Sequence, residues 1–190
     1  MEMKKIAIIG GGFAGLRILY KLNKSLHGKI SIDLIDKNDY SLEKPSLPEV
    51  AFAGKEVEKV RIPISSTIRG RNSRFIKGEV TNIDPKENVI HFENGESIKY
   101  DYLAITTGAV KDYDSIAGFR EHGFSICDDI EADRLSKKLK EFQGGHIVIG
   151  SSPTEWDSES TDIRLKAPCE GPIGEVMFMV DSYLRDRELR

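Results

Sequence analysis

The chain has 190 residues, 39% of them hydrophobic and 31% charged, and a formal net charge of −3. This length and composition predict a globular protein of one domain or slightly more, and the small negative charge argues against nucleic acid or an anionic membrane as a partner. Two cysteines are too few for a secreted disulfide scaffold, and we see no signal peptide or membrane-spanning run, so we expect a cytoplasmic setting.

The first predicted elements are a strand, a tight turn and a helix. An apolar run over residues 4–9 stops at three glycines, and a helical pattern then begins. Gly10, Gly12 and Gly15 follow the G-x-G-x-x-G spacing of a dinucleotide-binding turn. In such a turn the first glycine allows the sharp bend, the second the approach of a pyrophosphate, and the third close packing of helix on strand. The start of the helix offers free N–H groups and a partial positive charge to the phosphates.

A second strand is predicted over residues 29–36, and it ends in an acid. Asp36 lies 21 positions after Gly15 (36 − 15). At this spacing a carboxylate accepts the hydroxyl groups of an adenosine ribose and repels a 2′-phosphate. The alternative is a solvated acid at a strand end, but the preceding strand, glycines and helix favour the ribose role.

The middle of the chain predicts a change of pattern. Two prolines argue against a regular element over residues 39–49, and a short helix is expected over 62–68. Short strands follow over residues 74–77, 79–83, 89–92 and 97–100, with the hairpin signal Asn94-Gly95. These strands predict a small antiparallel insertion, at about residues 74–100, in an otherwise parallel fold.

A buried strand over residues 100–105 stops at Thr106-Thr107-Gly108-Ala109. An open α/β sheet binds its ligand at the carboxyl ends of such strands. Further strands are expected over residues 123–126 and 145–150, with a helix between them that carries Leu135 and Leu139. The strand over 145–150 looks like the opening of a second Rossmann-like unit, but Ser152 and Pro153 damage its glycine fingerprint.

A last helix opens at Gly171-Pro172, and the apolar run Met177-Phe178-Met179 predicts its burial on several sides. The fold class is therefore α/β, a Rossmann-like parallel sheet with a small antiparallel insertion and the start of a second Rossmann-like domain. We expect domains over residues 1–115 and 116–190. Because a lone strand cannot form a sheet, we expect a fragment, completed by the rest of a longer protein, a partner chain or a homo-oligomer.

Several segments together resemble the FAD domain of flavoproteins with two dinucleotide-binding domains. Within that group the chain is similar to sulfide:quinone oxidoreductases, particularly archaeal ones, over nearly its whole length but over only about the first half of such a protein. The segments that carry the resemblance are the glycine turn, the Asp36 strand end, Lys44-Pro45-Ser46-Leu47-Pro48, Gly78-Glu79-Val80, Thr106-Thr107-Gly108-Ala109, Phe124-Ser125-Ile126-Cys127 and Ala167-Pro168-Cys169-Glu170-Gly171-Pro172.

The resemblance implies FAD as the cofactor. It implies that the pyrophosphate lies on the glycine turn, the ribose at Asp36, the adenine at Val80 and the flavin along the loop of Pro45 and Ser46. In some members a cysteine at the place of Cys127 is the covalent anchor of the flavin. The implied cofactor-binding residues are Gly10, Gly12, Phe13, Ala14, Gly15, Asp36, Lys37, Pro45, Ser46, Val80, Thr106, Thr107, Gly108 and Cys127.

The resemblance also implies the chemistry, in which sulfide is oxidised through two redox cysteines and FAD and the electrons pass to a quinone. Cys169 is one of these cysteines, placed just before a helix start that can lower its pKa, and Glu170 beside it can move a proton. The plainer alternatives are a small buried thiol for Cys169 and an acid that complements the helix dipole for Glu170. For Cys127, inert burial and flavin attachment stay equally open.

Two other functions remain open. A type II NADH dehydrogenase needs no cysteine pair but needs an intact second glycine fingerprint. A non-catalytic nucleotide-binding module would keep the FAD cradle without the chemistry. The four histidines lack metal-ligand spacing, so no metal site is expected. The second redox cysteine, the quinone site and any peripheral attachment to the inner face of the membrane would lie in the part of the family's proteins that this chain does not cover.

Overall fold

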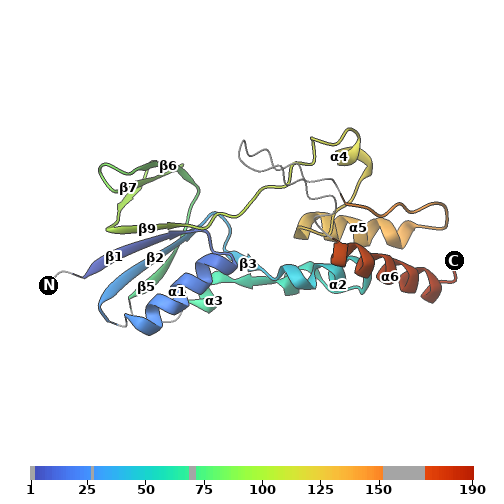
Figure 1. The fold of residues 1–190 in the computed structure, drawn as a ribbon, viewed down its shortest axis with the longest axis horizontal. Helices are drawn as coiled ribbons and strands as arrows, with labels where there is room; N and C mark the ends of the chain where they lie inside the picture. Colours follow the sequence, from blue (N-terminus) through green and yellow to red (C-terminus); the bar gives the residue numbers. More distant parts are fainter. Residues whose placement is uncertain (1–2, 27, 69–71, 152–169) are drawn as a thin grey trace. The chain divides into compact units, whose positions relative to one another are not determined.

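The computed structural model describes residues 3–26, 28–68, 72–151 and 170–190 (Figure 1). The chain divides into two compact units, one made of Met1–Glu43 and Glu58–Glu121, the other of Lys44–Val57 and His122–Arg190. All nine strands assigned in the described residues belong to the first unit.

A four-stranded parallel sheet forms the centre of the first unit, in the order β5-β2-β1-β9. Its strands are β1 (Lys4–Ile9), β2 (Ile30–Asp36), β5 (Ser73–Lys77) and β9 (Tyr102–Ile105). Helix α1 (Phe13–Ser25) connects β1 to β2, as the glycine turn predicts. Because the strands are parallel, their carboxyl ends meet at one edge, and the glycine turn lies there.

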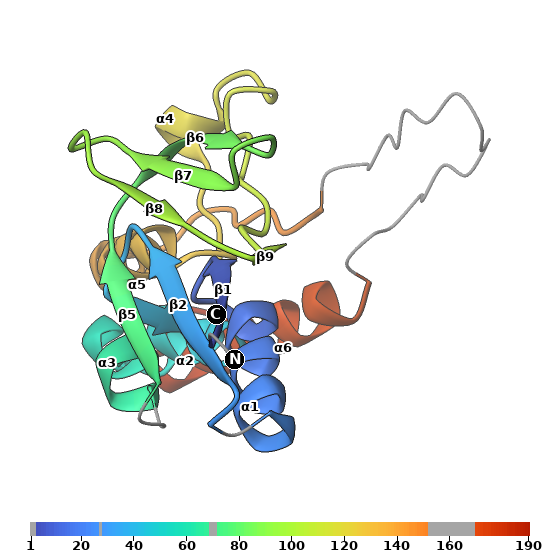
Figure 2. The same cartoon turned by 90° about the vertical axis from the view of Figure 1, so that its left-hand side faces the viewer.

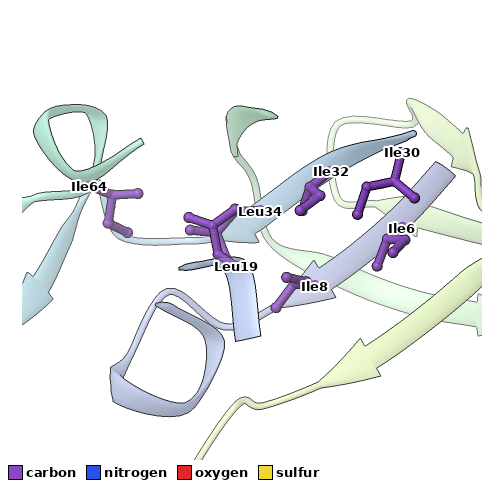
Figure 3. Packing of buried hydrophobic residues seen from close by; sticks show 7 residues of the cluster. All are labelled: Ile6, Ile8, Leu19, Ile30, Ile32, Leu34 and Ile64. Atoms are coloured by element: carbon purple, nitrogen blue, oxygen red, sulfur yellow. The ribbon is translucent and has the colours of Figure 1, made fainter. Parts of the chain in front are cut away.

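Both faces of this sheet are covered. On one face Ile6, Ile8, Leu19, Ile30, Ile32, Leu34 and Ile64 form a buried cluster (Figure 3). On the other face the alternate residues Ala7, Ile9 and Ile35 pack against Ile90 and Phe92. Successive side chains of a strand point to opposite faces, so a parallel strand buried on both sides reads as a continuous apolar run.

The small antiparallel sheet covers the face opposite α1 (Figure 2). It consists of β6 (Val80–Asp84), β7 (Val89–Phe92) and β8 (Ser97–Lys99), which confirms the predicted hairpins. The placement of residues 74–77 in this insertion is wrong, because β5 pairs in parallel with β2. Phe75 and Ile76 pack on opposite faces of the central sheet. The sequence of so short a strand does not indicate which strand it pairs with.

The remaining elements of the first unit are short. Strands β3 (Tyr40–Leu42) and β4 (Arg61–Pro63) form an antiparallel pair. The helix expected over 62–68 is α3 (Ile64–Thr67), which begins after Pro63 because the preceding residues belong to β4. A 3₁₀ turn, η2 (Val57–Val60), precedes β4, and helix α4 (Phe119–His122) lies at the boundary of the two units.

Helices form the second unit. They are η1 (Lys44–Ser46), α2 (Leu47–Phe52), α5 (Asp129–Glu141) and α6 (Glu170–Asp186). Helices α2, α5 and α6 share an apolar cluster of Ala51, Phe52, Leu139 and Val180. Helices α5 and α6 confirm the prediction, whereas the irregular stretch expected over 39–49 is wrong. Pro48 is the second residue of α2, where a helix tolerates proline because the missing N–H has no partner within the helix.

Two predicted strands are absent from the described part of the second unit. Residues 123–126 and 145–150 form no strand there, since a strand exists only as part of a ladder and the described residues of this unit offer no partner. The expected burial of α6 on several sides, from which we infer a fragment, stays a prediction, because the described side chains cover only part of the helix. Val180 is buried, but Met177 is 53% and Phe178 71% exposed.

Candidate functional site

The first and last glycines of the turn are fixed by close backbone neighbours. Gly10 has a φ of +107°, and a Cβ there would lie 2.3 Å from the carbonyl oxygen of Thr106. A Cβ on Gly15 would lie 1.8 Å from the carbonyl oxygen of Gly10. The Thr106 hydroxyl contacts the carbonyl oxygens of Ile9 and Gly10 at 2.9 and 3.0 Å. The residue after β9 and the first turn of α1 therefore lie in close contact with the turn, and neither Gly10 nor Gly15 can carry a side chain.

Gly12 is different, because a Cβ there would meet nothing within 4 Å. It is the N-cap of α1, which has no side-chain cap and no acid in its first turn. The first N–H groups of the helix and its positive dipole end therefore face an open space that suits an anion. Phe13, 60% exposed, and Ala14, also exposed, border this space.

Asp36, at the end of β2, is held against the turn. Its Oδ2 accepts the N–H of Gly11 at 2.6 Å, and its Oδ1 accepts the N–H of Asn38 at 2.8 Å. Each carboxylate oxygen has two lone pairs, so both keep capacity for a hydroxyl donor. Sequence reasoning missed Gly11 and Asn38, because Gly11 occupies a variable position of the motif and backbone donors carry no residue signal.

Gly11 is also enclosed from its other side. A Cβ on Gly11 would lie 2.5 Å from Cδ1 of Ile64 and 3.4 Å from Oδ2 of Asp36. Ile64, the first residue of α3, is fully buried. The turn therefore lies between the carboxylate of β2 and a core side chain of α3.

A shallow hollow lies at the ends of β1 and β9. Its lining brings together Val80, which the resemblance implies at the adenine, and Thr107, which it implies at the border of the cofactor, and adds residues that sequence reasoning missed. The lining residues are Ile9, Val80, Thr81, Asn82, Ile83, Ile105 and Thr107. Gly108 follows at the exposed end of β9, with a φ of +73°. The alternating pattern of a strand such as β6 predicts which of its residues share a face, but it does not predict that this face lines a ligand site. Sequence reasoning therefore missed these lining residues.

One ion pair lies next in sequence to the Asp36 strand end. The Lys77 ammonium is 2.8 Å from Oδ2 of Asp39. This hydrogen bond and the Lys77 charge hold the pKa of Asp39 below its ordinary value, so Asp39 is ionised at neutral pH and is compensated by Lys77. Lys37, between Asp36 and Asn38, is exposed.

The remaining predicted site residues lie outside the first unit. Pro45 and Ser46 belong to η1 in the second unit, where the buried Ser46 hydroxyl accepts a hydrogen bond from Lys55 at 3.2 Å. Cys127 is exposed there, and its N–H donates to Oγ of Ser125 at 3.0 Å. Cys169 lies outside the described residues, and so does the side chain of Glu170, the first residue of α6.

The described residues contain neither a metal-binding cluster nor a membrane-spanning helix. In that part of the chain no three His, Cys, Asp or Glu side chains cluster in a way that could hold a metal ion. None of its helices is both long and apolar enough to cross a bilayer.

The glycine turn, the open helix start, the strand-end carboxylate and the hollow are what a dinucleotide needs. The helix start suits a pyrophosphate, Asp36 can accept hydroxyl donors, and the hollow offers Ile9, Val80 and Ile105 as apolar contacts. The residues present therefore fit the adenosine diphosphate half of FAD.

Comparison with known proteins agrees with this geometry. Residues 4–155 match the model of the pyridine nucleotide-disulphide oxidoreductase family. The chain is 30% identical over 189 residues to a sulfide-quinone reductase of Aquifex aeolicus and 30% identical over 141 residues to a type II NADH:quinone oxidoreductase of Staphylococcus aureus. The first alignment includes 98% of this chain and 41% of the sulfide-quinone reductase. The second includes 74% of this chain and 35% of the type II NADH:quinone oxidoreductase.

The structural comparison gives the same neighbour. The crystal structure of the sulfide:quinone oxidoreductase from A. aeolicus superimposes with a TM-score of 0.80 at 29% identity, over 98% of this chain and 41% of that chain. The chain thus spans less than half of the proteins it matches. Over the length that it does span, it belongs to the pyridine nucleotide-disulphide oxidoreductase family and is the FAD-binding part of a flavoprotein oxidoreductase.

Proposed function

We propose that the glycine turn and its surroundings hold the adenosine diphosphate half of FAD. Gly10, Gly12, Phe13, Ala14 and Gly15 form the seat of the pyrophosphate. Asp36, beside Lys37, accepts the ribose hydroxyls, and Val80 lines the adenine site. Thr106, Thr107 and Gly108 border the cofactor at the end of β9.

The observation that carries this proposal is the open start of α1 beside the anchored Asp36. A Cβ on Gly12 would meet nothing, and no acid competes with a phosphate in the first turn. The Gly11 N–H fixes Asp36 at this place. A turn needed only for folding would require Gly10 and Gly15 but would not require Gly12.

Titration of the apo-protein with FAD tests the site. Asp36→Asn removes the charge and one acceptor, and we expect it to weaken FAD binding about tenfold, the magnitude of a lost hydrogen bond to a charged group. Asp84→Asn is the matched control, because Asp84 also ends a strand and accepts two backbone N–H groups, those of Lys86 and Glu87. Equal affinities of the two variants for FAD would refute the ribose role of Asp36.

We further propose that the protein oxidises sulfide and passes the electrons to a quinone. Bound FAD supplies an acceptor for two electrons. In this proposal Cys169 is one of the two redox cysteines and Glu170 exchanges a proton beside it, while Pro45 and Ser46 lie along the flavin and Cys127 is its covalent anchor. The support is the similarity to the A. aeolicus enzyme over 98% of this chain.

This activity is tested in the full gene product. Sulfide should bleach the flavin absorption band, and added quinone should restore it. Cys169→Ser should abolish the bleaching by sulfide while FAD stays bound. Reduction by NADH and not by sulfide would favour a type II NADH:quinone oxidoreductase instead. Mass spectrometry of the denatured protein decides whether flavin is attached to Cys127.

The same proposal includes the setting of the protein. It places the enzyme in the cytoplasm, in peripheral contact with the membrane where the quinone resides. It also retains a dinucleotide-binding domain over residues 1–115 and a second, incomplete one over residues 116–190, completed by further sequence, a partner chain or a second copy. Neither part of the proposal involves nucleic acid.

A further inference from the structure

A second hollow of the first unit, the polar hollow, lies toward the amino ends of the parallel strands. Its volume is about 250 Å³, and its lining residues are Lys5, Ser31, Asp33, Asn72, Ser73 and Arg74. Lys5, Ser31 and Arg74 are each the second residue of their strand. The glycine turn follows the last residue of β1, so the polar hollow is separate from the proposed FAD site.

The polar hollow interrupts an apolar face of the central sheet. Because side chains alternate along a strand, Lys5 shares a face of β1 with Ala7 and Ile9, and Asp33 shares a face of β2 with Ile35. Ala7, Ile9 and Ile35 pack against the antiparallel sheet. A buried ion pair is seldom more stabilising than the apolar residues that could replace it. Folding of the sheet alone therefore does not explain why charged residues stand here.

Asp33 arranges two cations around one of its oxygen atoms. Nζ of Lys5 lies 3.1 Å and Nη2 of Arg74 lies 3.2 Å from Oδ2 of Asp33. The Asp33 side chain is 4% exposed, whereas the side chains of Lys5 and Arg74 are 31% and 62% exposed. The negative charge is thus buried beneath two positive charges that stay accessible. Because both cationic nitrogens contact the same atom, they are close enough together for one small anion to bridge them.

Both cations also keep donors that no described residue accepts. An ammonium group has three N–H donors and a guanidinium group has five. Asp33 accepts one from Lys5 and two from Arg74, and the described residues offer these two side chains no other acceptor. The Ser31 hydroxyl and the Asn72 amide, which also line the polar hollow, make no hydrogen bond to the described residues either. The lining therefore presents several donors and a surplus of one positive charge.

We propose that the polar hollow binds a small oxyanion with two negative charges, such as sulfate or phosphate. Lys5 and Arg74 hold the anion by charge-assisted hydrogen bonds, and Ser31 and Asn72 donate to its remaining oxygens. Asp33 is a positioning residue, which fixes both cations from the buried side. The anion connects β5, β2 and β1, three neighbouring strands of the sheet.

A purely structural role for the two cations gives a different expectation. If Lys5 and Arg74 only neutralised Asp33, no anion would bind at a fixed stoichiometry. Salts would then act on the protein by screening, and sulfate would stabilise it further by exclusion from the protein surface. An effect of that kind does not saturate, whereas occupation of one site does.

The test is equilibrium dialysis of the full gene product against radiolabelled sulfate, with sodium chloride added to keep the ionic strength constant. We expect one sulfate per chain, displaced by unlabelled phosphate, and a urea midpoint that rises with the occupancy of the site. Lys5→Met should weaken sulfate binding about tenfold, the value of a hydrogen bond to a charged group. Ser31→Ala should weaken it about threefold, and because it leaves the ion pairs with Asp33 intact, it tests the site even if Lys5→Met fails to fold.

Lys4→Met is the matched control. It removes the same charge from the neighbouring position of β1, where Lys4 pairs with Asp101 at 2.6 Å, and neither residue lines the polar hollow. We expect this variant to bind sulfate as the wild type does. Absence of saturable sulfate binding to the wild type, or an equal loss in Lys4→Met and Lys5→Met, would overturn the inference. Titration with FAD is a separate measurement, so failure of the proposed function would leave this result standing.

Discussion

The glycines of the turn differ in the kind of atom that confines them. At Gly10 and Gly15 the obstacle to a side chain is a backbone carbonyl, which cannot move without β9 or β1. At Gly11 it is the end of the Ile64 side chain, at 2.5 Å. At Gly12 there is no obstacle. Within six positions of the chain, glycine is thus confined by backbone at two positions, by a side chain at one and by nothing at Gly12.

This difference predicts that a substitution at Gly11 can be rescued. Gly11→Ala should destabilise the protein by about 1–3 kcal/mol, the usual cost of overpacking a core. Ile64→Val removes the Cδ1 atom that the new Cβ would meet, so Gly11→Ala/Ile64→Val should recover most of this loss and also the affinity for FAD. Urea unfolding and FAD titration measure the two effects.

The control for this rescue is Ile8→Val, which removes one carbon from the same buried cluster without touching Gly11. Combined with Gly11→Ala it should give no recovery, and the two losses should add. Gly15→Ala should stay defective with either valine variant. Recovery by Ile8→Val would mean that general relief of packing acts there, and not the removal of a specific contact.

At the scale of elements, the sequence predicts well whatever depends on neighbours along the chain. The strand, turn and helix at residues 4–25, the hairpin at Asn94-Gly95 and helices α5 and α6 follow from local pattern and are confirmed. The segment around Pro48 does not, because two prolines in one stretch indicate a loop. Proline lacks an N–H, and this is tolerated both in a loop and in the first turn of a helix. Two prolines are therefore compatible with a loop and with the start of a short helix.

Pairing between distant strands is harder to predict. Whether residues 74–77 join the hairpins or the central sheet depends on β2, about 40 positions earlier in the chain, to which Arg74 is joined through Asp33. Residues 145–150 fit a buried strand by composition but have no ladder in the described residues. A strand forms only by hydrogen bonding to a second strand, and the sequence of one segment does not indicate which strand that is.

The candidate site was predictable to the extent that it follows a motif. Gly10, Gly12, Gly15 and Asp36 come from spacing alone, and the structure brings them together. The hydrogen bonds of Gly11 and Asn38 with Asp36, and the contact of Lys55 with Ser46, arise from chain reversals that no spacing rule describes.

For the molecule as a whole, the first unit depends on a buried charge within its parallel sheet. Asp33 of β2 is 3% exposed. Its carboxylate accepts hydrogen bonds from Arg74 of β5 at 2.6 and 3.2 Å and lies 3.1 Å from the Lys5 ammonium of β1. One side chain therefore joins three of the four strands of the parallel sheet.

This arrangement predicts an acid-labile first unit. Burial raises the pKa of Asp33, but hydrogen bonds from Arg74 and Lys5 outweigh it and hold the pKa below its ordinary value of 3.8. A lowered folded pKa means that the unfolded chain binds the proton more readily. The stabilisation by Asp33 is therefore complete well above pH 3.8 and is lost as the pH falls through the folded pKa.

Asp33→Asn should consequently cost about 1–3 kcal/mol at pH 7, because two cations lose their charged partner, and the variant should lose less further stability than the wild type on acidification. Urea unfolding followed by circular dichroism between about pH 5 and pH 2.5 measures both effects. Asp101→Asn is the comparison, because Asp101 bonds the ammonium of Lys4 and the N–H of Lys5 but is exposed, and its effect should be smaller. If Asp33→Asn kept the full acid sensitivity of the wild type, other carboxylates would be its source, and the three-strand connection would not control how the first unit responds to pH.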